Sequence, residues 1–507
     1  MESEKMIHMK EKRERFCLLA GTLVLCLFNI GASPLIHAIS ADSALFVTMG
    51  RAMCAQRVLY RDIFDHKGLY VFLVNMVGAL ISGRSLNGLF LVETFALCFD
   101  ILLIYRICRM IQNPGQSVIS SLLFGAVGTN YFLFAGGNLV EEYALPFQLI
   151  SLYLILRYLQ RLPSAHPGKY MFIHGICCGF CLWLRANLVM MWIPAVSLIL
   201  VREIAEKRYA DVWRNIGWGL LGLCVISVPV LLYGTVNHCM NEMFFAAFTF
   251  NFQYTAAHGN GLIGNILKTL FNKNELVVLL LCIGSCILVW KKADSWFSRG
   301  LFVSMFGFCF LSTALSGRAY WQYYVYLLPF TLPSLFVISE KLCQKKTLRK
   351  ISPFLIVGAG ICSGILLPSR ILAECFDIHV TLYEKNRVDY KTCATLKEAA
   401  FPSSDNVLVT GGNSQFYVEM NVVPQLKYPF ALSMSYEEFP YPYEEQLNSI
   451  VLHQDDVVVL VNESYDVNQY EPVYDGLREE EVEDALNRYY RLAYRSPTTG
   501  TRMYFRK

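Results

Sequence analysis

The sequence predicts an α-helical polytopic membrane protein that carries a small C-terminal α/β domain. Of its 507 residues, 55% are hydrophobic and only 17% are charged, and the mean hydropathy is +0.39. A soluble domain is closer to one quarter charged. Apolar runs of about eighteen residues or more recur from residue 16 to residue 369, which is the length that a helix needs to cross a bilayer. After residue 372 the pattern changes to short apolar strands and one charged helix.

The charge balance and the cysteines exclude two other classes. The formal net charge is +4, which is modest for 507 residues, and no nucleic-acid partner is expected. Most of the seventeen cysteines lie inside apolar runs, where they act as small hydrophobic side chains. No CxxC pair or Cys/His spacing indicates a zinc site of the usual kind.

The first apolar run, residues 16–36, follows five basic residues within the first fifteen. Ala38-Ile39-Ser40-Ala41 offers a plausible signal-peptide cleavage site. The run is long for a signal peptide and many spans follow, so we expect an uncleaved first helix with a cytoplasmic N-terminus.

The run 69–82 is predicted to lie in the membrane interface without crossing it. Fourteen helical residues cover about 21 Å, which is short of the roughly 30 Å hydrocarbon core. The next run ends at Arg106 and Arg109, and the positive-inside rule places these arginines in the cytoplasm only if 69–82 does not cross.

If that run does not cross, about eleven spans cross the membrane in alternating directions, and the loops rich in basic residues fall on the cytoplasmic side. They make up a transmembrane domain, residues 1–372, with external loops 38–68 and 237–272. The spans are 16–36, 88–108, 115–135, 139–160, 169–184, 187–202, 214–236, 274–291, 299–316, 321–340 and 351–369.

Residues 373–507 are then extracytoplasmic. Residues 407–412 and 456–461 indicate buried strands, 479–487 a helix, and 501–506 an edge strand, because its side chains alternate. Gly411-Gly412-Asn413 lacks the further glycines of a nucleotide-binding fingerprint and is read as a strand-end turn.

The first external loop is a polar stretch within a largely apolar chain. Asp42 follows the first span, and an amphipathic segment comes next, with Leu45, Met49 and Met53 on one face and Arg51 and Gln56 off it. The segment Arg61–Gly68 then packs five ionisable residues into eight positions.

Polar residues gather at the outer ends of the predicted spans. Each one alone is compatible with headgroup contact, but together they could hold a phosphate beside a carboxylate base. They are Asp42, Asp65, His66, Lys67, Glu141, Glu142, Arg185, His258, Arg318 and Tyr320.

These residues resemble the GT-C glycosyltransferases, the superfamily of protein O-mannosyltransferases and aminoarabinose transferases. The likeness lies in the aspartate after span one, the amphipathic helix, and the acidic pair and arginine turn that follow. Tyr60–Gly68 matches the bacterial signature Y-x-D-x-F-D-H-K-G-P, with Leu69 in place of proline. The resemblance covers about residues 15–340.

The resemblance implies inverting transfer of a sugar from a polyprenyl-phosphate carrier at the outer face. Asp42 would be the catalytic base, and Lys67, Arg185 and Arg318 would bind the donor phosphate. Asp65, His66, Glu141, Glu142, His258 and Tyr320 would orient the sugar or a metal. A divalent metal on Asp65, His66 and Glu142 is left open, and Tyr60, Tyr70, Tyr320 and Tyr323 could stack on the sugar.

The acceptor is expected to be a glycan, a lipid or a protein of the cell envelope, which places the protein in a bacterial plasma membrane. The alternative is a transporter or flippase of lipid-linked glycans. We find no internal repeat, and the charged residues singled out lie at one face, whereas transporters bind near mid-membrane. A polysaccharide polymerase or ligase with a similar donor is a third reading.

Overall fold

A computed structural model of the chain describes residues 2–258, 261–272, 275–315, 320–365, 381–411, 413–430, 434–461 and 478–507. The chain divides into two compact units. The first consists of Met1–His37, Phe90–Tyr233 and His258–Leu367, and the second of Ala38–Leu89, Gly234–Ala257 and Pro368–Lys507. The first external loop therefore clusters with the C-terminal segment. The boundary expected at residues 372 and 373 stays a prediction.

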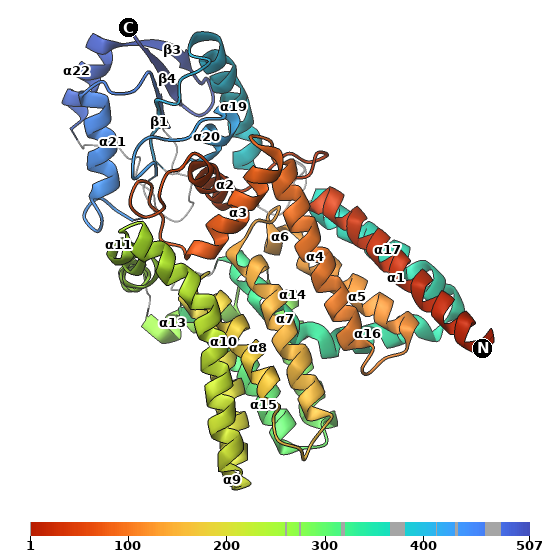
Figure 1. The fold of residues 1–507 in the computed structure, drawn as a ribbon. Helices are drawn as coiled ribbons and strands as arrows, with labels where there is room; N and C mark the ends of the chain where they lie inside the picture. The colour runs from red at the N-terminus through yellow and green to blue at the C-terminus, as the bar shows by residue number, and fades with distance from the viewer. Residues whose placement is uncertain are drawn as a thin grey trace. The chain divides into compact units, whose positions relative to one another are not determined.

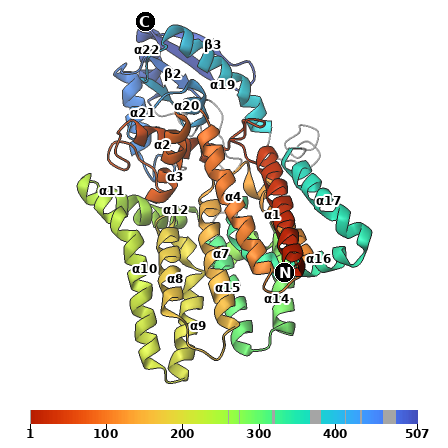
Figure 2. The same cartoon turned by 45° about the vertical axis from the view of Figure 1, so that its right-hand side comes forward.

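The first unit is helical. Its N-terminal helix and its last helix pack side by side, as Figures 1 and 2 show. Its elements are α1 Glu2–Asn29, α4 Asn87–Cys108, α5 Pro114–Gly128, α6 Tyr131–Phe134, α7 Val140–Leu159, α8 Gly168–Leu182, η1 Ala186–Val189, α9 Trp192–Ala205, α10 Tyr209–Val236, α13 Gly261–Leu270, α14 Leu276–Lys292, α15 Trp296–Leu315, η3 Trp321–Thr331, α16 Leu332–Gln344 and α17 Lys346–Ile365.

A helix lies at each of the eleven predicted spans. Within the described residues, five helical segments are long and apolar enough to cross a membrane: Asn87–Cys108, Ala186–Ala205, Tyr209–Val236, Trp296–Leu315 and Trp321–Gln344. The helix α10 leaves large apolar side chains such as Trp213 and Leu232 exposed, as a lipid-facing helix does. The protein is therefore an integral membrane protein, and the number eleven stays a prediction.

Polar side chains join the helices of the first unit. Asn29 donates to Thr129 Oγ1 at 2.8 Å and to the Gly360 carbonyl at 3.2 Å. Ser285 donates to Ser334 Oγ at 2.9 Å. Small polar residues at such contacts are typical of helices that associate in a bilayer.

The second unit carries a four-stranded mixed sheet in the order β1-β2-β4-β3. Strands β1 and β2 are parallel, β2 and β4 are antiparallel, and β3 and β4 form an antiparallel pair. The elements of this part of the chain are α19 Thr381–Ala400, β1 Val407–Val409, α20 Gln415–Met420, α21 Tyr441–Val451, β2 Val457–Leu460, α22 Glu479–Tyr489, β3 Tyr490–Arg495 and β4 Arg502–Arg506.

Helices cover both faces of this sheet. Tyr390 of α19 and Phe416 of α20 pack against one face, and Ile450 of α21 and Val482 of α22 pack against the other (Figure 1). The predicted edge strand at 501–506 is wrong in one respect, because β4 pairs on both sides and β3 forms the edge. Side chains alternate along β4 because successive residues point to opposite faces of the sheet. This alternation does not indicate whether the strand has a neighbour on one side or on both.

The first external loop and the predicted loop 237–272 are largely helical. The amphipathic segment forms α2, Ala41–Cys54, and the predicted interfacial helix forms α3, Leu69–Ser82. A Cβ on Gly50 would lie 2.6 Å from the Asn75 carbonyl carbon, so glycine permits the close packing of α2 on α3. The later segment contains α11 Met240–Phe244, the π-helix η2 Phe245–Thr249, α12 Phe250–His258 and α13.

We expect a single cysteine at Ser85, just after α3, to react with a membrane-impermeant thiol reagent added outside the cell. Ser85 is exposed, and the topology places it outside because α3 is too short to cross. Ser164, exposed in the loop between α7 and α8, is the matched cytoplasmic control. In a cysteine-light background, Ser85 labelling that requires membrane permeabilisation would contradict this topology.

Candidate functional site

The motif at Tyr60–Gly68 is a tightly folded loop in the second unit. The Tyr60 amide donates to the Ile63 carbonyl at 2.7 Å, and the Tyr60 hydroxyl donates to the Lys67 carbonyl at 2.9 Å. Tyr60 has φ = 73°, which is unfavourable for an aromatic residue. Its ring is fully buried, so the prediction that Tyr60 stacks on a sugar is wrong: the ring is part of the core of the loop.

Phe64 anchors the middle of the motif. Its ring, 1% exposed, packs on Phe250 and on Tyr428 and Phe439 from the C-terminal segment. Its amide donates to the Lys427 carbonyl at 2.8 Å. The residues that follow Phe64 are therefore held on a fixed base, as precise chemistry requires.

Asp65, His66 and Lys67 form a connected row. Asp65 is fully buried, and its Oδ1 accepts from the Lys67 amide at 2.8 Å. Lys67 Nζ lies 2.6 Å from His66 Nε2, and His66 Nδ1 lies 3.8 Å from Asp65 Oδ2. An ammonium can only donate. A Lys67 ammonium would therefore donate to His66 Nε2, and the tautomer that fits this contact carries its proton on Nδ1, on the side of Asp65.

The charges of this row are set by burial and by one another. Burial raises the pKa of Asp65, and Lys67 opposes that rise, whereas Asp42 adds to it. Asp42 is half-buried in the first turn of α2, where Ser40 accepts a hydrogen bond from the Ser43 amide and begins the helix. The structure thus brings Asp42 close enough to Asp65 for the two carboxylates to interact electrostatically.

Aromatic and amide groups of α12 hold the histidine. The His66 ring stacks on Phe250 at 5.0 Å and on Tyr254 at 5.9 Å between ring centroids. Asn251 Nδ2 donates to the His66 carbonyl at 2.9 Å. The backbone of His258 lies in α12, and its side chain lies outside the description.

Two arginines fasten the first loop to the C-terminal segment. Arg51, expected off the packed face of α2, is buried and donates to the Val418 carbonyl at 3.2 Å. Arg57 donates to the carbonyls of Pro424, at 2.5 Å, and Asp62. The sequence could not indicate these contacts, because Val418 and Pro424 lie far from the two arginines along the chain.

We expect Arg57→Gln to loosen the loop that carries the motif by about 1–3 kcal/mol, because buried carbonyls lose their donor. The measurement is the rate of limited proteolysis between Ala55 and Lys67. Arg61→Gln is the matched control, since Arg61 is nearly half exposed and its pair with Asp62 contributes at most about 1 kcal/mol. Equal cleavage rates in the two variants would contradict this role of Arg57.

The predicted acidic pair of the first unit is divided between two environments. Glu141 accepts a charged hydrogen bond from Arg185, which also donates to Asn187 Oδ1 at 2.8 Å. The Arg185 guanidinium lies 4.5 Å from the ring centroid of Tyr323, and the ring of Tyr320 packs edge-on against Tyr323. Part of the charge of Arg185 is therefore already balanced by a carboxylate.

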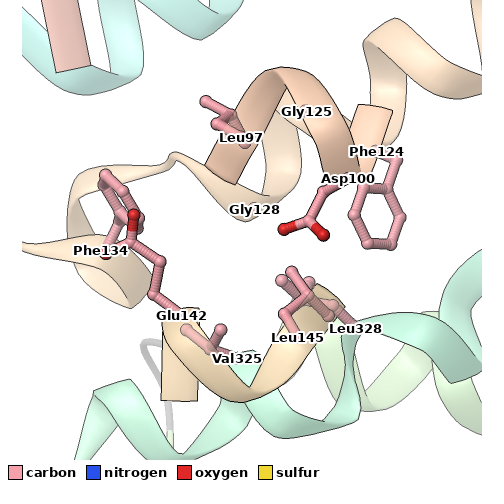
Figure 3. Close-up of a pocket in the computed structure, with 10 residues that line it drawn as sticks. All are labelled: Leu97, Asp100, Phe124, Gly125, Gly128, Phe134, Glu142, Leu145, Val325 and Leu328. Carbon is pink, nitrogen blue, oxygen red and sulfur yellow. The ribbon is translucent and has the colours of Figure 1, made fainter. Parts of the chain in front are cut away.

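Glu142 turns away from that ion pair into the interior of the unit. Its Oε2 accepts from the Leu139 amide at 3.3 Å, and it lines a cavity together with Asp100 of α4 (Figure 3). Glu93, on the same helix as Asp100, is also buried. Glu93 and Asp100 are not among the predicted site residues. The signal in the sequence is that both are acidic residues inside an otherwise apolar predicted span.

The described residues do not fit a metal site. Among them, no group of three or more His, Cys, Asp or Glu side chains is arranged to hold a metal ion. His66 Nε2 is occupied by Lys67, and Glu142 faces the cavity with Asp100. Arg318, a predicted phosphate ligand, lies outside the described residues.

Comparison with known families gives one match that spans most of the chain. The profile described as "Putative competence-induced protein Ccs4 N-terminal domain" matches residues 2–353. The chain belongs to this family. A comparison with curated proteins finds no match.

Solved structures identify the fold. ArnT from Cupriavidus metallidurans, a crystal structure with bound undecaprenyl phosphate, aligns with a TM-score of 0.64 at 12% identity and covers 96% of this chain and 97% of ArnT. The Archaeoglobus fulgidus oligosaccharyltransferase, solved with Zn and sulfate, aligns with a TM-score of 0.48 at 14% identity over 97% of this chain and 73% of its own. The alignment with ArnT shows that the chain has the GT-C fold, and the resemblance in the sequence is confirmed at that level.

Proposed function

We propose that this protein transfers a sugar from a polyprenyl-phosphate carrier to an acceptor hydroxyl at the outer face of the membrane. The observation that carries the proposal is the match in fold, along nearly the whole of both chains, to ArnT bound to undecaprenyl phosphate. The aspartate of α2 and the Asp65-His66-Lys67 row supply the groups that such a reaction needs.

In the proposed reaction, Asp42 takes the proton of the acceptor hydroxyl as its oxygen attacks the anomeric carbon. The new carbon–oxygen bond forms as the bond between the anomeric carbon and the phosphate oxygen breaks. A single in-line displacement inverts the anomeric configuration. General-base help of this kind typically contributes about 10²–10⁴ in rate.

The departing polyprenyl phosphate gains negative charge, and Lys67 is the proposed group that stabilises it. Such stabilisation is effective when the cation is held in place before the reaction. In this proposal Lys67 donates one hydrogen bond to His66 Nε2 and has two further N–H groups for phosphate oxygens. Arg185 is proposed as a second phosphate ligand, with Glu141 as its orienting partner.

The acceptor is proposed to be a glycan, lipid or protein of the cell envelope, and the membrane a bacterial plasma membrane. A polymerase or ligase would use the same donor and the same base, and would differ only in the acceptor. No step of the proposed reaction requires a metal ion.

A transporter or flippase of lipid-linked glycans is the second candidate. Glu93 and Asp100 favour it, because carboxylates inside a membrane span are typical of proton-coupled transport. They also correct the expectation that the charged residues of this chain lie at one face only. A flippase, unlike a transferase, leaves the sugar–phosphate bond intact.

The test is to incubate membranes that contain the protein with a panel of radiolabelled polyprenyl-phosphate sugars and to follow the label. We expect the label of one donor to move into a product that is no longer extracted with the donor lipid. Membranes with the Lys67→Ala variant are the control for background transferases. If no donor loses label beyond that background, the proposal is wrong.

A further inference from the structure

Three buried carboxylates of the first unit have no role in the proposed reaction. Glu93 and Asp100 are seven residues apart on α4 and therefore share one face of that helix. Glu142 comes from the first turn of α7. The three side chains are 0%, 1% and 5% exposed.

Asp100 and Glu142 border one small cavity, which Figure 3 shows between α4, α5, α6, α7 and η3. The space that it offers to a water-sized particle is about 20 Å³, enough for one water molecule. The other side chains around it are apolar, or glycine: Leu97, Phe124, Gly125, Gly128, Phe134, Leu145, Val325 and Leu328.

Each of the two carboxyls leaves one oxygen unsatisfied. Asp100 Oδ1 and Glu142 Oε1 are buried and have no hydrogen-bond partner among the described residues. Both oxygens of Glu93 are in the same state, and a Cβ on Gly137 would collide with Glu93 Oε1. Gly137, with φ = 85°, adopts a conformation that favours glycine and brings the backbone close to this carboxylate.

No cation balances these groups in the part of the chain that the structure describes. Glu142 acts electrostatically on both Glu93 and Asp100. The arginines of the two helices, Arg106 of α4 and Arg157 of α7, lie in the last turns, and Glu141 pairs with Arg185. The elements around the cavity otherwise contribute thiol and phenol groups such as Cys98 of α4, Tyr131 of α6 and Tyr326 of η3, whose hydroxyl donates to the Leu188 carbonyl. The helix α5 carries none.

Ionised carboxylates in such surroundings would be costly. A charge buried without a partner is unfavourable by far more than a neutral polar group, and two like charges around one cavity repel each other as well. A proton removes the charge of a carboxylate without needing further ligands. A metal ion would need several oxygen ligands, and the lining offers only two carboxylates among apolar groups.

We propose that Asp100 and Glu142 form a proton-binding site inside the first unit, in which both carboxyls are neutral acids that face a single water in the cavity. The ligand of the site is the proton. Glu93 lies on the same face of α4 as Asp100 and interacts electrostatically with Glu142, so its protonation is linked to that of the site. This site is separate from the transfer chemistry proposed above.

The test is infrared difference spectroscopy of the purified full-length protein in lipid nanodiscs at pH 7. We expect the carbonyl band of neutral carboxylic acids, shifted in D₂O. Asp100→Asn and Glu142→Gln should each remove a part of this band, because an amide copies the shape of the neutral acid but lacks its carbonyl signature. Asp211→Asn is the matched control, since that carboxylate pairs with Arg214 outside the cavity.

Thermal unfolding of the same samples provides the second measurement. Neutral amides in place of neutral acids should leave the midpoint within a few degrees of the wild type. A wild-type protein without the neutral-acid band at pH 7 overturns the proposal, as does a band that disappears on addition of Na⁺, Mg²⁺ or Ca²⁺, which would make this a metal site. If either variant does not fold, the wild-type band and its response to these cations decide the question.

Discussion

The Asp42→Asn variant should lose sugar transfer by about 10²–10⁴-fold while it still inserts into the membrane. The amide keeps the shape of the carboxylate and can accept a hydrogen bond, but it cannot take up a proton at neutral pH. The helix α2 should persist, because its N-terminal cap is the Ser40–Ser43 contact and does not involve Asp42. A lost charge at a helix N-terminus costs only about 0.3–1 kcal/mol.

Transfer rates at saturating donor measure this effect, with Asp294→Asn as the control. Asp294 is an exposed aspartate in the turn before α15, so its variant should behave as the wild type. An Asp42→Asn protein that turns over donor at near wild-type rate would falsify the role of this residue, and Asp65 would become the next candidate for the base.

Replacing Lys67 should produce the second largest effect. Lys67→Ala removes a charged hydrogen bond to the donor phosphate, which is worth on the order of 1.5–3 kcal/mol, or about 10- to 100-fold in kcat/KM. Lys67→Arg keeps the charge but replaces a point donor with a planar one, so we expect partial activity.

The measurement is kcat/KM at limiting donor, with the exposed Lys391→Ala as the matched control. His66→Ala adds a second readout. If His66 acts only through Lys67, then His66→Ala should cost little in the Lys67→Ala background and more in the wild type. Additive losses would show that His66 acts independently of Lys67, and an unaffected Lys67→Ala variant would exclude Lys67 as a phosphate ligand.

The sequence predicts the helices and the motif loop well because their signals are local. The bounds of α3, 69–82, follow from the length of one apolar run, and the helical character of α2 follows from the spacing of its apolar residues. The strands β1 and β2 follow in the same way from short runs of valine and leucine.

What could not be predicted depends on partners that are distant in the sequence. Arg51 is buried because its acceptor is the carbonyl of Val418, and the environment of Phe64 is completed by Tyr428 and Phe439. Glu141 pairs with Arg185, whereas Glu142 faces the cavity, and this difference depends on how α7 packs against its neighbours. Two adjacent glutamates in a sequence do not indicate which of them will form the ion pair.

The central claim is that the protein breaks the bond between a sugar and a polyprenyl phosphate. The most direct measurement uses proteoliposomes with the purified protein, a radiolabelled polyprenyl-phosphate sugar and an extract of cell-envelope acceptors, and it quantifies the free polyprenyl phosphate. We predict that free carrier and labelled product appear in equal amounts, only with acceptor present, and that Asp42→Asn abolishes both. Labelled lipid that reaches the opposite leaflet with its sugar–phosphate bond intact, and no free carrier, would contradict the account and indicate a flippase.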